Sequence, residues 1–205
     1  RLRVRTSPSS GRSLATLRKA RALRPGDTIG IAAPASPIEE DVLEAGEQLI
    51  RALGFEPARG EGVTATYGYL AGDDARRAAE LMALATDPDI HGILCARGGY
   101  GCHRMVSKLD DRVIRKAAKP LVGYSDITTL LLWQRQRAGL IGVHGPMLER
   151  GESTPVEAHR ELARVLMGEG KPPRWSGETW VGGSREGRLT GGSLSLVVAS
   201  LGTPW

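Results

Sequence analysis

The sequence contains few aromatic residues and few cysteines. Aromatic residues make up 4% of the chain, with a single phenylalanine, so its core must be built mainly from aliphatic side chains. No apolar run approaches the ~20 residues needed to cross a bilayer, and no segment has the pattern of a signal peptide. The two cysteines, Cys95 and Cys102, form no CxxC motif, so a zinc site is not expected. Reduced thiols and a cytoplasmic location are the default expectation.

Acidic residues are missing from the start of the chain, where the first acid is Asp27. The formal net charge is +5, and much of the excess lies among the arginines and the lysine between Arg1 and Arg24. We expect residues 1–22 to be a disordered basic tail. Such an arm can contact nucleic acid or an anionic surface. No basic stripe interleaved with aromatics continues beyond it, so nucleic acid is not an expected partner.

Apolar runs of strand length alternate with helical patterns along most of the chain. The expected strands cover 28–33, 55–58, 90–96, 120–122 and 140–143, and the expected helices cover 37–53, 75–86, 102–109, 126–138 and 155–167. Capping boxes that begin at Ser36 and Thr154 are predicted to start two of these helices. Strands that are apolar on both faces predict an α/β fold with a parallel sheet flanked by helices. This N-terminal domain is expected to span residues 23–167.

The pattern changes after residue 167. Residues 168–173 have the composition of a linker, and residues 174–181 could form a strand. A short strand, a glycine turn and an apolar helix are expected within 186–205. We interpret residues 168–205 as a linker followed by the beginning of a second domain.

Unusual residues follow four of the expected strands. In an open parallel sheet, ligands gather beyond the carboxyl ends of the strands. The segments that should therefore converge on one rim are Ala35-Ser36, 97-RGGYG-101, Tyr124-Ser125-Asp126 and His144-Gly145-Pro146.

Ser125 stands at the hinge between a buried strand and a helix, which allows two interpretations. Serine or aspartate at this place can simply cap the helix. The turn also resembles a nucleophile elbow, because Gly123 lies two residues before the serine. Ile127 occupies the position of the second glycine in G-x-S-x-G, so the usual hydrolase signature is incomplete. The pattern alone leaves both interpretations open.

The glycines at 98, 99 and 101 let backbone N–H groups approach a ligand closely. They could hold a phosphate, stabilise an oxyanion or simply make a tight turn. The segment has neither the Walker A pattern nor the GxGxxG spacing, which disfavours phosphate.

A serine nucleophile needs a base, and His144 is the only histidine expected on the same rim. No carboxylate is recognisable in the sequence as an orienting partner for it, so a complete triad within the chain is not expected. His91 begins a strand and lies at the wrong end of the sheet. His103 and His159 fall on helices, where we interpret them as structural or exposed.

Six segments in this order resemble the LD-carboxypeptidases, which are serine peptidases of murein recycling, and the related microcin C self-immunity peptidases. They are TIGIAAPASP, AGDDARRAAEL, ARGGYGCHRMV, KPLVGYSDITTLL, HGPML and EGRLTGGSLSLVVASLGTPW. The resemblance covers roughly residues 23–205. It implies an N-terminal α/β domain followed by a smaller β-rich domain, a homodimer, and no metal or organic cofactor. The implied substrate is a small peptide such as a murein tetrapeptide, and a membrane partner is not implied.

The resemblance also implies roles for individual residues. Ser125 would be the nucleophile, and the N–H groups of Asp126 and Gly99 would form the oxyanion hole. The reaction would be hydrolysis, through an acyl-enzyme, of the amide before a terminal D-amino acid. The other residues of the glycine loop that are expected to bind substrate are Arg97, Gly98 and Tyr100.

Two features depart from the family pattern. The family's base is a histidine oriented by a glutamate, and both lie beyond the GTPW motif that ends at Trp205, so the 205 residues alone are expected to be inactive or nearly so. Ser193 stands where the family usually has asparagine. The alternative to an enzyme is a non-catalytic α/β module that binds a small peptide or an anion.

Overall fold

A computed structural model describes residues 17–149, 155–169, 174, 176–184 and 186–205. Its strands are β1 Thr28–Ala32, β2 Glu56–Arg59, β3 Gly92–Cys95, β4 Leu121–Gly123 and β5 Val143–His144. Its α-helices are α1 Glu40–Ala52, α2 Asp74–Thr86, α3 Cys102–Met105, α4 Asp111–Ala117, α5 Thr128–Trp133, α6 Val156–Leu166 and α7 Leu194–Ala199. Short helical turns η1 Val106–Lys108 and η2 Ser125–Ile127 follow α3 and β4, and η3 Gln134–Ala138 is a π-helical end to α5.

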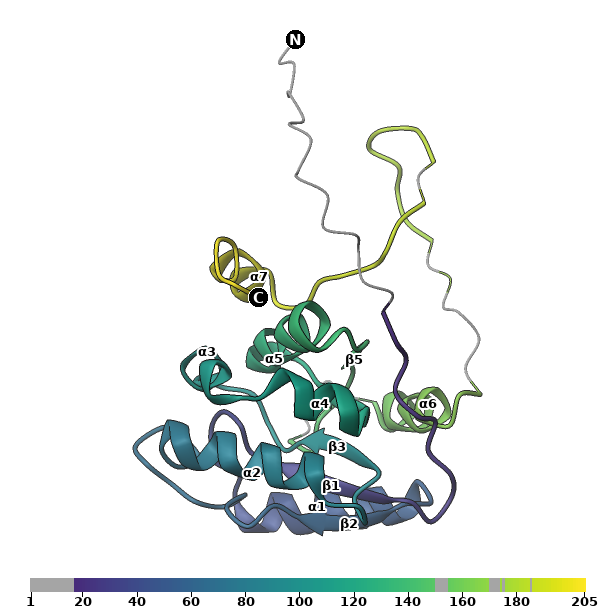
Figure 1. Cartoon of the computed structure of the whole chain (residues 1–205). Helices are drawn as coiled ribbons and strands as arrows, with labels where there is room; N and C mark the ends of the chain where they lie inside the picture. The colour runs from purple at the N-terminus through teal and green to yellow at the C-terminus, as the bar shows by residue number, and fades with distance from the viewer. Residues whose placement is uncertain (1–16, 150–154, 170–173, 175, 185) are drawn as a thin grey trace.

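The strands form one parallel sheet in the order β2-β1-β3-β4-β5 (Figure 1). Its register brings Ile31 beside Leu94, and Leu94 beside Val122. The strand order reverses direction at β1, between β2 and β3. In sheets of this kind, ligands bind near such a reversal, beyond the carboxyl ends of the strands. The predicted fold class is confirmed.

Each face of the sheet is covered by its own set of helices. Side chains alternate along the strands, so Ile93 and Cys95 pack with the buried residues of α2, α3, α4 and α5. Leu94 packs on the opposite face with the buried residues of α1 and α6. At ~25 cal/mol per Å² of apolar surface, these two aliphatic layers supply most of the driving force for folding.

Two predictions about helices were wrong. Ser36 does not cap α1, which begins at Glu40 with Glu39 as its N-cap and no side-chain cap bond. The backbone N–H of Ser36 instead donates to Gly98 O at 3.2 Å. The second error is that α4 was not predicted. This helix is only seven residues long and is capped by Asp110, whose carboxylate accepts from Arg112 N and Val113 N. Thr154, the expected cap of α6, lies outside the described residues.

The strands expected after residue 173 are not found in the described part of 174–190. Figure 1 shows that this chain extends away from the sheet and returns to α7, which lies against α5. The N–H of Ser193 donates to Thr128 Oγ1 at 3.0 Å. A Cβ on Gly192 would lie 2.4 Å from Thr128 Cγ2, so only glycine allows this close approach. The apolar helix expected in this region is present as α7.

The chain just before β1 is attached to the domain. Arg18 N donates to Gly139 O at 2.9 Å, and Ile141 N donates to Arg18 O at 2.9 Å. These bonds form a parallel bridge between Arg18 and Leu140. The expected tail, residues 1–22, therefore extends too far, because Arg18 is already hydrogen-bonded to the chain between η3 and β5. Among the described residues, no helix is long and apolar enough to span a membrane.

Candidate active site

The Ser36, Gly98 and Ser125 segments meet at the carboxyl ends of β1, β3 and β4. A Cβ built on Gly98 would lie 2.9 Å from Ser125 Cβ and 3.0 Å from Ser125 Oγ. A Cβ on Gly99 would lie only 2.1 Å from Ser36 Oγ. Both glycines thus allow an approach that any other residue would obstruct. Three of the four predicted rim segments converge in this way.

Ser125 has an unusual backbone conformation. Its φ is +57°, and the only other described non-glycine residue with positive φ is Ala118. This region costs an L-residue ~1–2 kcal/mol, and such strain concentrates at functional sites. A simple N-cap residue adopts an extended conformation instead. The geometry therefore matches a nucleophile elbow more closely than a cap.

The residues on either side explain how the elbow forms without a second glycine. Ile127 Cγ2 would lie 2.8 Å from a Cβ on Gly123. The isoleucine side chain therefore packs against Gly123. The turn accommodates this isoleucine at the position where G-x-S-x-G has its second glycine. Ile127 N donates to Tyr124 O at 3.1 Å and closes the turn.

Ser125 is partly exposed. Its Oγ forms no hydrogen bond with any of the described residues. Met147, which follows the HGP segment, is a further neighbour of this position, because its Cε would lie 3.5 Å from a Cβ on Gly98. A hydroxyl with no internal partner can be directed toward a ligand.

Asp126 links the serine turn to the glycine loop. Its carboxylate is buried, and Oδ2 accepts from Cys102 N at 2.9 Å at the start of α3. Burial raises the pKa of the Cys102 thiol well above its ordinary range, and the Asp126 carboxylate raises it further. The N–H of Asp126 lies in the first turn of η2, where helical N–H groups have no intrahelical acceptor. The carboxylate therefore holds the two segments together, and the N–H has no acceptor among the described residues.

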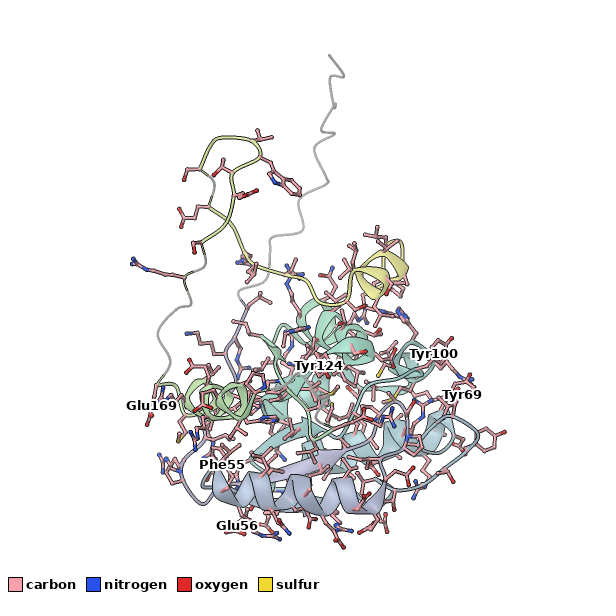
Figure 2. All side chains as sticks on the ribbon, turned by 180° about the vertical axis from the view of Figure 1, so that it is seen from behind. Phe55, Glu56, Tyr69, Tyr100, Tyr124 and Glu169 are labelled. Carbon is pink, nitrogen blue, oxygen red and sulfur yellow. The ribbon has the colours of Figure 1, made fainter. Side chains whose placement is uncertain are left out.

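Arg97 and Tyr100 belong to the glycine loop at the rim, and each interacts with residues other than Ser125. Arg97 Nη1 donates to Pro37 O at 3.2 Å, and its Nε lies 3.1 Å from Glu149 Oε2. Tyr100 is 53% exposed and forms an edge-to-face pair with Tyr69, with ring centroids 5.8 Å apart. Both tyrosines lie at one edge of the molecule (Figure 2).

The histidines are placed as the sequence suggested, and none of the four hydrogen-bonds Ser125 within the described structure. His144 is exposed, with its ring centroid 6.3 Å from that of Tyr124. His91 Nδ1 accepts from Thr28 N at 3.0 Å, at the opposite end of the strands. His159 is buried, and its Nε2 lies 3.1 Å from Met147 O. His103 is partly buried.

Arg77 supports the site and was missed at the sequence level. It is buried, and its guanidinium donates to Pro34 O at 2.5 Å and to Gly72 O at 3.1 Å, and pairs with Asp74. A Cβ on Gly101 would lie 2.6 Å from its Nη1, so the arginine packs under the glycine loop. A signal existed, because Arg77, Leu81 and Leu84 share the helical spacing of the apolar face.

No group of three or more histidine, cysteine, aspartate or glutamate side chains in the described ranges is arranged to hold a metal ion.

The fold and the rim define an α/β protein that presents a serine at a strained strand-to-helix turn. Residues 29–145 match the LD-carboxypeptidase N-terminal domain (Peptidase_S66). The chain belongs to the LD-carboxypeptidase family.

Particular relatives agree with this assignment. The chain is 36% identical over 197 residues to a probable murein peptide carboxypeptidase of Bacillus subtilis, covering 91% of this chain and 60% of that protein. It is 35% identical over 190 residues to the murein tetrapeptide carboxypeptidase of Pseudomonas aeruginosa, covering 85% of this chain and 60% of that protein. A solved structure of the microcin C7 self-immunity protein MccF is 26% identical with a TM-score of 0.77, covering 91% of this chain and 66% of that chain. The chain thus spans about 60% of the length of these curated relatives.

Proposed function

We propose that this chain supplies the serine nucleophile of an LD-carboxypeptidase that removes the terminal D-amino acid from a murein tetrapeptide. The observation that carries the proposal is the positive φ of Ser125 beside the bare Cα of Gly98. That arrangement presents a hydroxyl at the carboxyl edge of the sheet, with no internal partner among the described residues. The names of the Bacillus and Pseudomonas relatives support the choice of a murein peptide.

The reaction proceeds in two steps. Ser125 Oγ attacks the carbonyl carbon of the scissile amide while its proton passes to a base. The N–H groups of Asp126 and Gly99 stabilise the resulting oxyanion. Collapse of the tetrahedral intermediate breaks the C–N bond, and the D-amino acid leaves with the proton on its amine. Water then hydrolyses the acyl-enzyme by the same route and releases Ser125.

We place the base outside the described residues, in keeping with the histidine and glutamate that the family resemblance implies. Residues 1–205 alone should therefore turn over a murein tetrapeptide very slowly or not at all. Arg97, Gly98 and Tyr100 are proposed to contact the substrate. The proposal extends to a cytoplasmic homodimer for the whole protein, which light scattering would test.

The test joins residues 1–205 to the remaining C-terminal part of the Bacillus relative. This chimaera should release a D-amino acid from murein tetrapeptide, detected with D-amino-acid oxidase. Ser125→Ala should lower kcat by at least about 10⁴-fold, whereas Ser107→Ala, which alters an exposed serine of η1, should leave it unchanged. Gly98→Ala should also lower kcat, because the new Cβ would lie 3.0 Å from the nucleophilic oxygen.

The alternative is a module that binds a small peptide or anion without cleaving it. A chimaera that binds the tetrapeptide in calorimetry, releases no D-amino acid and forms no adduct with a fluorophosphonate would favour that alternative. Full activity of Ser125→Ala would refute the nucleophile assignment.

A further inference from the structure

A basic hollow lies on the side of the sheet where β4 and β5 begin. It is open to solvent, has a volume of about 470 Å³ and is lined by Arg18, Arg112, Arg115 and Lys116, with Asp111 as its one acid. Arg18 comes from the chain before β1, and the others come from α4. Ser125 follows β4, so the hollow and the candidate active site lie at opposite ends of that strand.

The backbone brings these cations together. Residues 112, 115 and 116 have the i, i+3, i+4 spacing that places side chains on one helix face. Gly139 joins this face to Arg18, because Gly139 O accepts from Arg18 N at 2.9 Å. Arg115 Nη2 would lie 3.7 Å from a Cβ on the same glycine and donates to Arg137 O at 3.0 Å. The guanidinium of Arg115 is thereby positioned before any ligand binds.

The positive charge in the hollow is not compensated locally. Within the described structure, the side chains of Arg18, Arg112 and Lys116 form no ion pair, and all three are exposed. Asp111, the one acid in the lining, already lies 3.4 Å from Arg137 Nε. By contrast, Arg160 and Arg164 on the exposed face of α6 each pair with a glutamate of the same helix. A concentration of unpaired cations in a concave surface raises the local concentration of anions.

We propose that this hollow binds a soluble oligophosphate, an anion with at least two linked phosphate groups. Guanidinium groups match phosphate oxygens in bidentate geometry, and several separated cations require more than one anionic group. Membrane-binding surfaces combine basic residues with apolar anchors, and single-stranded nucleic acid sites add aromatic platforms. The residues that line the hollow include neither kind of side chain.

The test measures tripolyphosphate binding to the 205-residue chain by isothermal calorimetry in 50 mM and 300 mM NaCl. The proposal predicts saturable binding that weakens at the higher salt, because screening shortens the reach of exposed charges. Arg112→Gln with Lys116→Gln should weaken binding at least about tenfold, the loss expected for one or two charge-assisted hydrogen bonds. Both side chains are exposed, so the fold should be kept, which circular dichroism would check.

The matched control is Arg160→Gln with Arg164→Gln on α6. It removes the same charge at the same i, i+4 spacing, but from arginines that already have acidic neighbours. Binding should be unchanged in this variant. An equal loss in both double variants would show a general charge effect and overturn the proposal.

Vesicles of phosphatidylcholine with phosphatidylglycerol form the second arm. Binding to these vesicles without binding to tripolyphosphate would overturn the proposal and assign the hollow to an anionic lipid surface. Absence of binding to either probe would also overturn it. The proposal does not depend on the peptidase assignment, because its residues and its readout are separate from Ser125.

Discussion

Replacing Ser125 by glycine should yield a more stable chain than replacing it by alanine. Both changes remove the hydroxyl, so the difference between their free energies of unfolding reports the cost of the backbone conformation at this position. The φ of +57° costs an L-residue ~1–2 kcal/mol. Glycine avoids this cost but loses ~0.5–1 kcal/mol more conformational entropy on folding. The net difference should be about 1 kcal/mol in favour of Ser125→Gly, or roughly 2–4 °C in Tm for a domain of this size.

Urea unfolding followed by circular dichroism measures this difference. Ala118→Gly is a positive control, because Ala118 is the left-handed C-cap of α4, with φ +50°. It should also be stabilising. Ala79→Gly lies in the regular part of α2 and should destabilise by about 1 kcal/mol. If Ser125→Gly is no more stable than Ser125→Ala while both controls behave as expected, the strained elbow is refuted.

Three further predictions concern residues around the site. Burial raises the pKa values of the Cys95 and Cys102 thiols. Both should resist Ellman's reagent at pH 8 until the chain unfolds, and stability should fall as the pH rises above ~8.5, because only the unfolded state then releases these protons. Rapid labelling of the folded chain would contradict this. Thr128→Val should lower hydrogen-exchange protection of the Ser193 amide about tenfold, since it removes the acceptor of that N–H. Thr129→Val should leave that protection unchanged, because Thr129 Oγ1 is buried with no hydrogen-bond partner in the described part of the chain; equal effects would refute the docking role of Thr128. Arg77→Met should destabilise by ~3 kcal/mol in urea unfolding, because buried acceptors lose their donor. The exposed Arg76→Met should cost less than ~1 kcal/mol, and a similar loss for both would argue against an anchoring role for Arg77.

The sequence predicted the sheet and the rim because both depend on local signals. Apolar runs alternate with helical patterns, and parallel strands necessarily place their carboxyl ends together. Ser125 was singled out by its position at a strand-to-helix hinge, although the pattern could not separate a cap from a nucleophile. The positive φ favours the elbow, and it depends on the packing of Ile127 against Gly123, which the pattern did not reveal.

Other features depend on contacts between distant segments, and the sequence could not show them. Ser36 has the pattern of an N-cap, but its N–H is bonded to Gly98 O, so α1 begins later. The helix α4 is too short to show a clear period of 3.6 residues. The 174–181 segment has strand-like composition, yet no strand is found in its described part. Strand formation needs a partner as well as a suitable sequence.

The bond between the Asp126 carboxylate and Cys102 N has a consequence for motion at the rim. Because this bond is buried and involves a charge, separating the serine turn from the start of α3 would leave a carboxylate without its donor in a poorly hydrated place. The turn and the glycine loop should therefore move as one cooperative unit. Local opening would dismantle the nucleophile and the oxyanion donors together, and hydrogen exchange of the hydrogen-bonded Cys102 and Ile127 amides should report a single opening free energy.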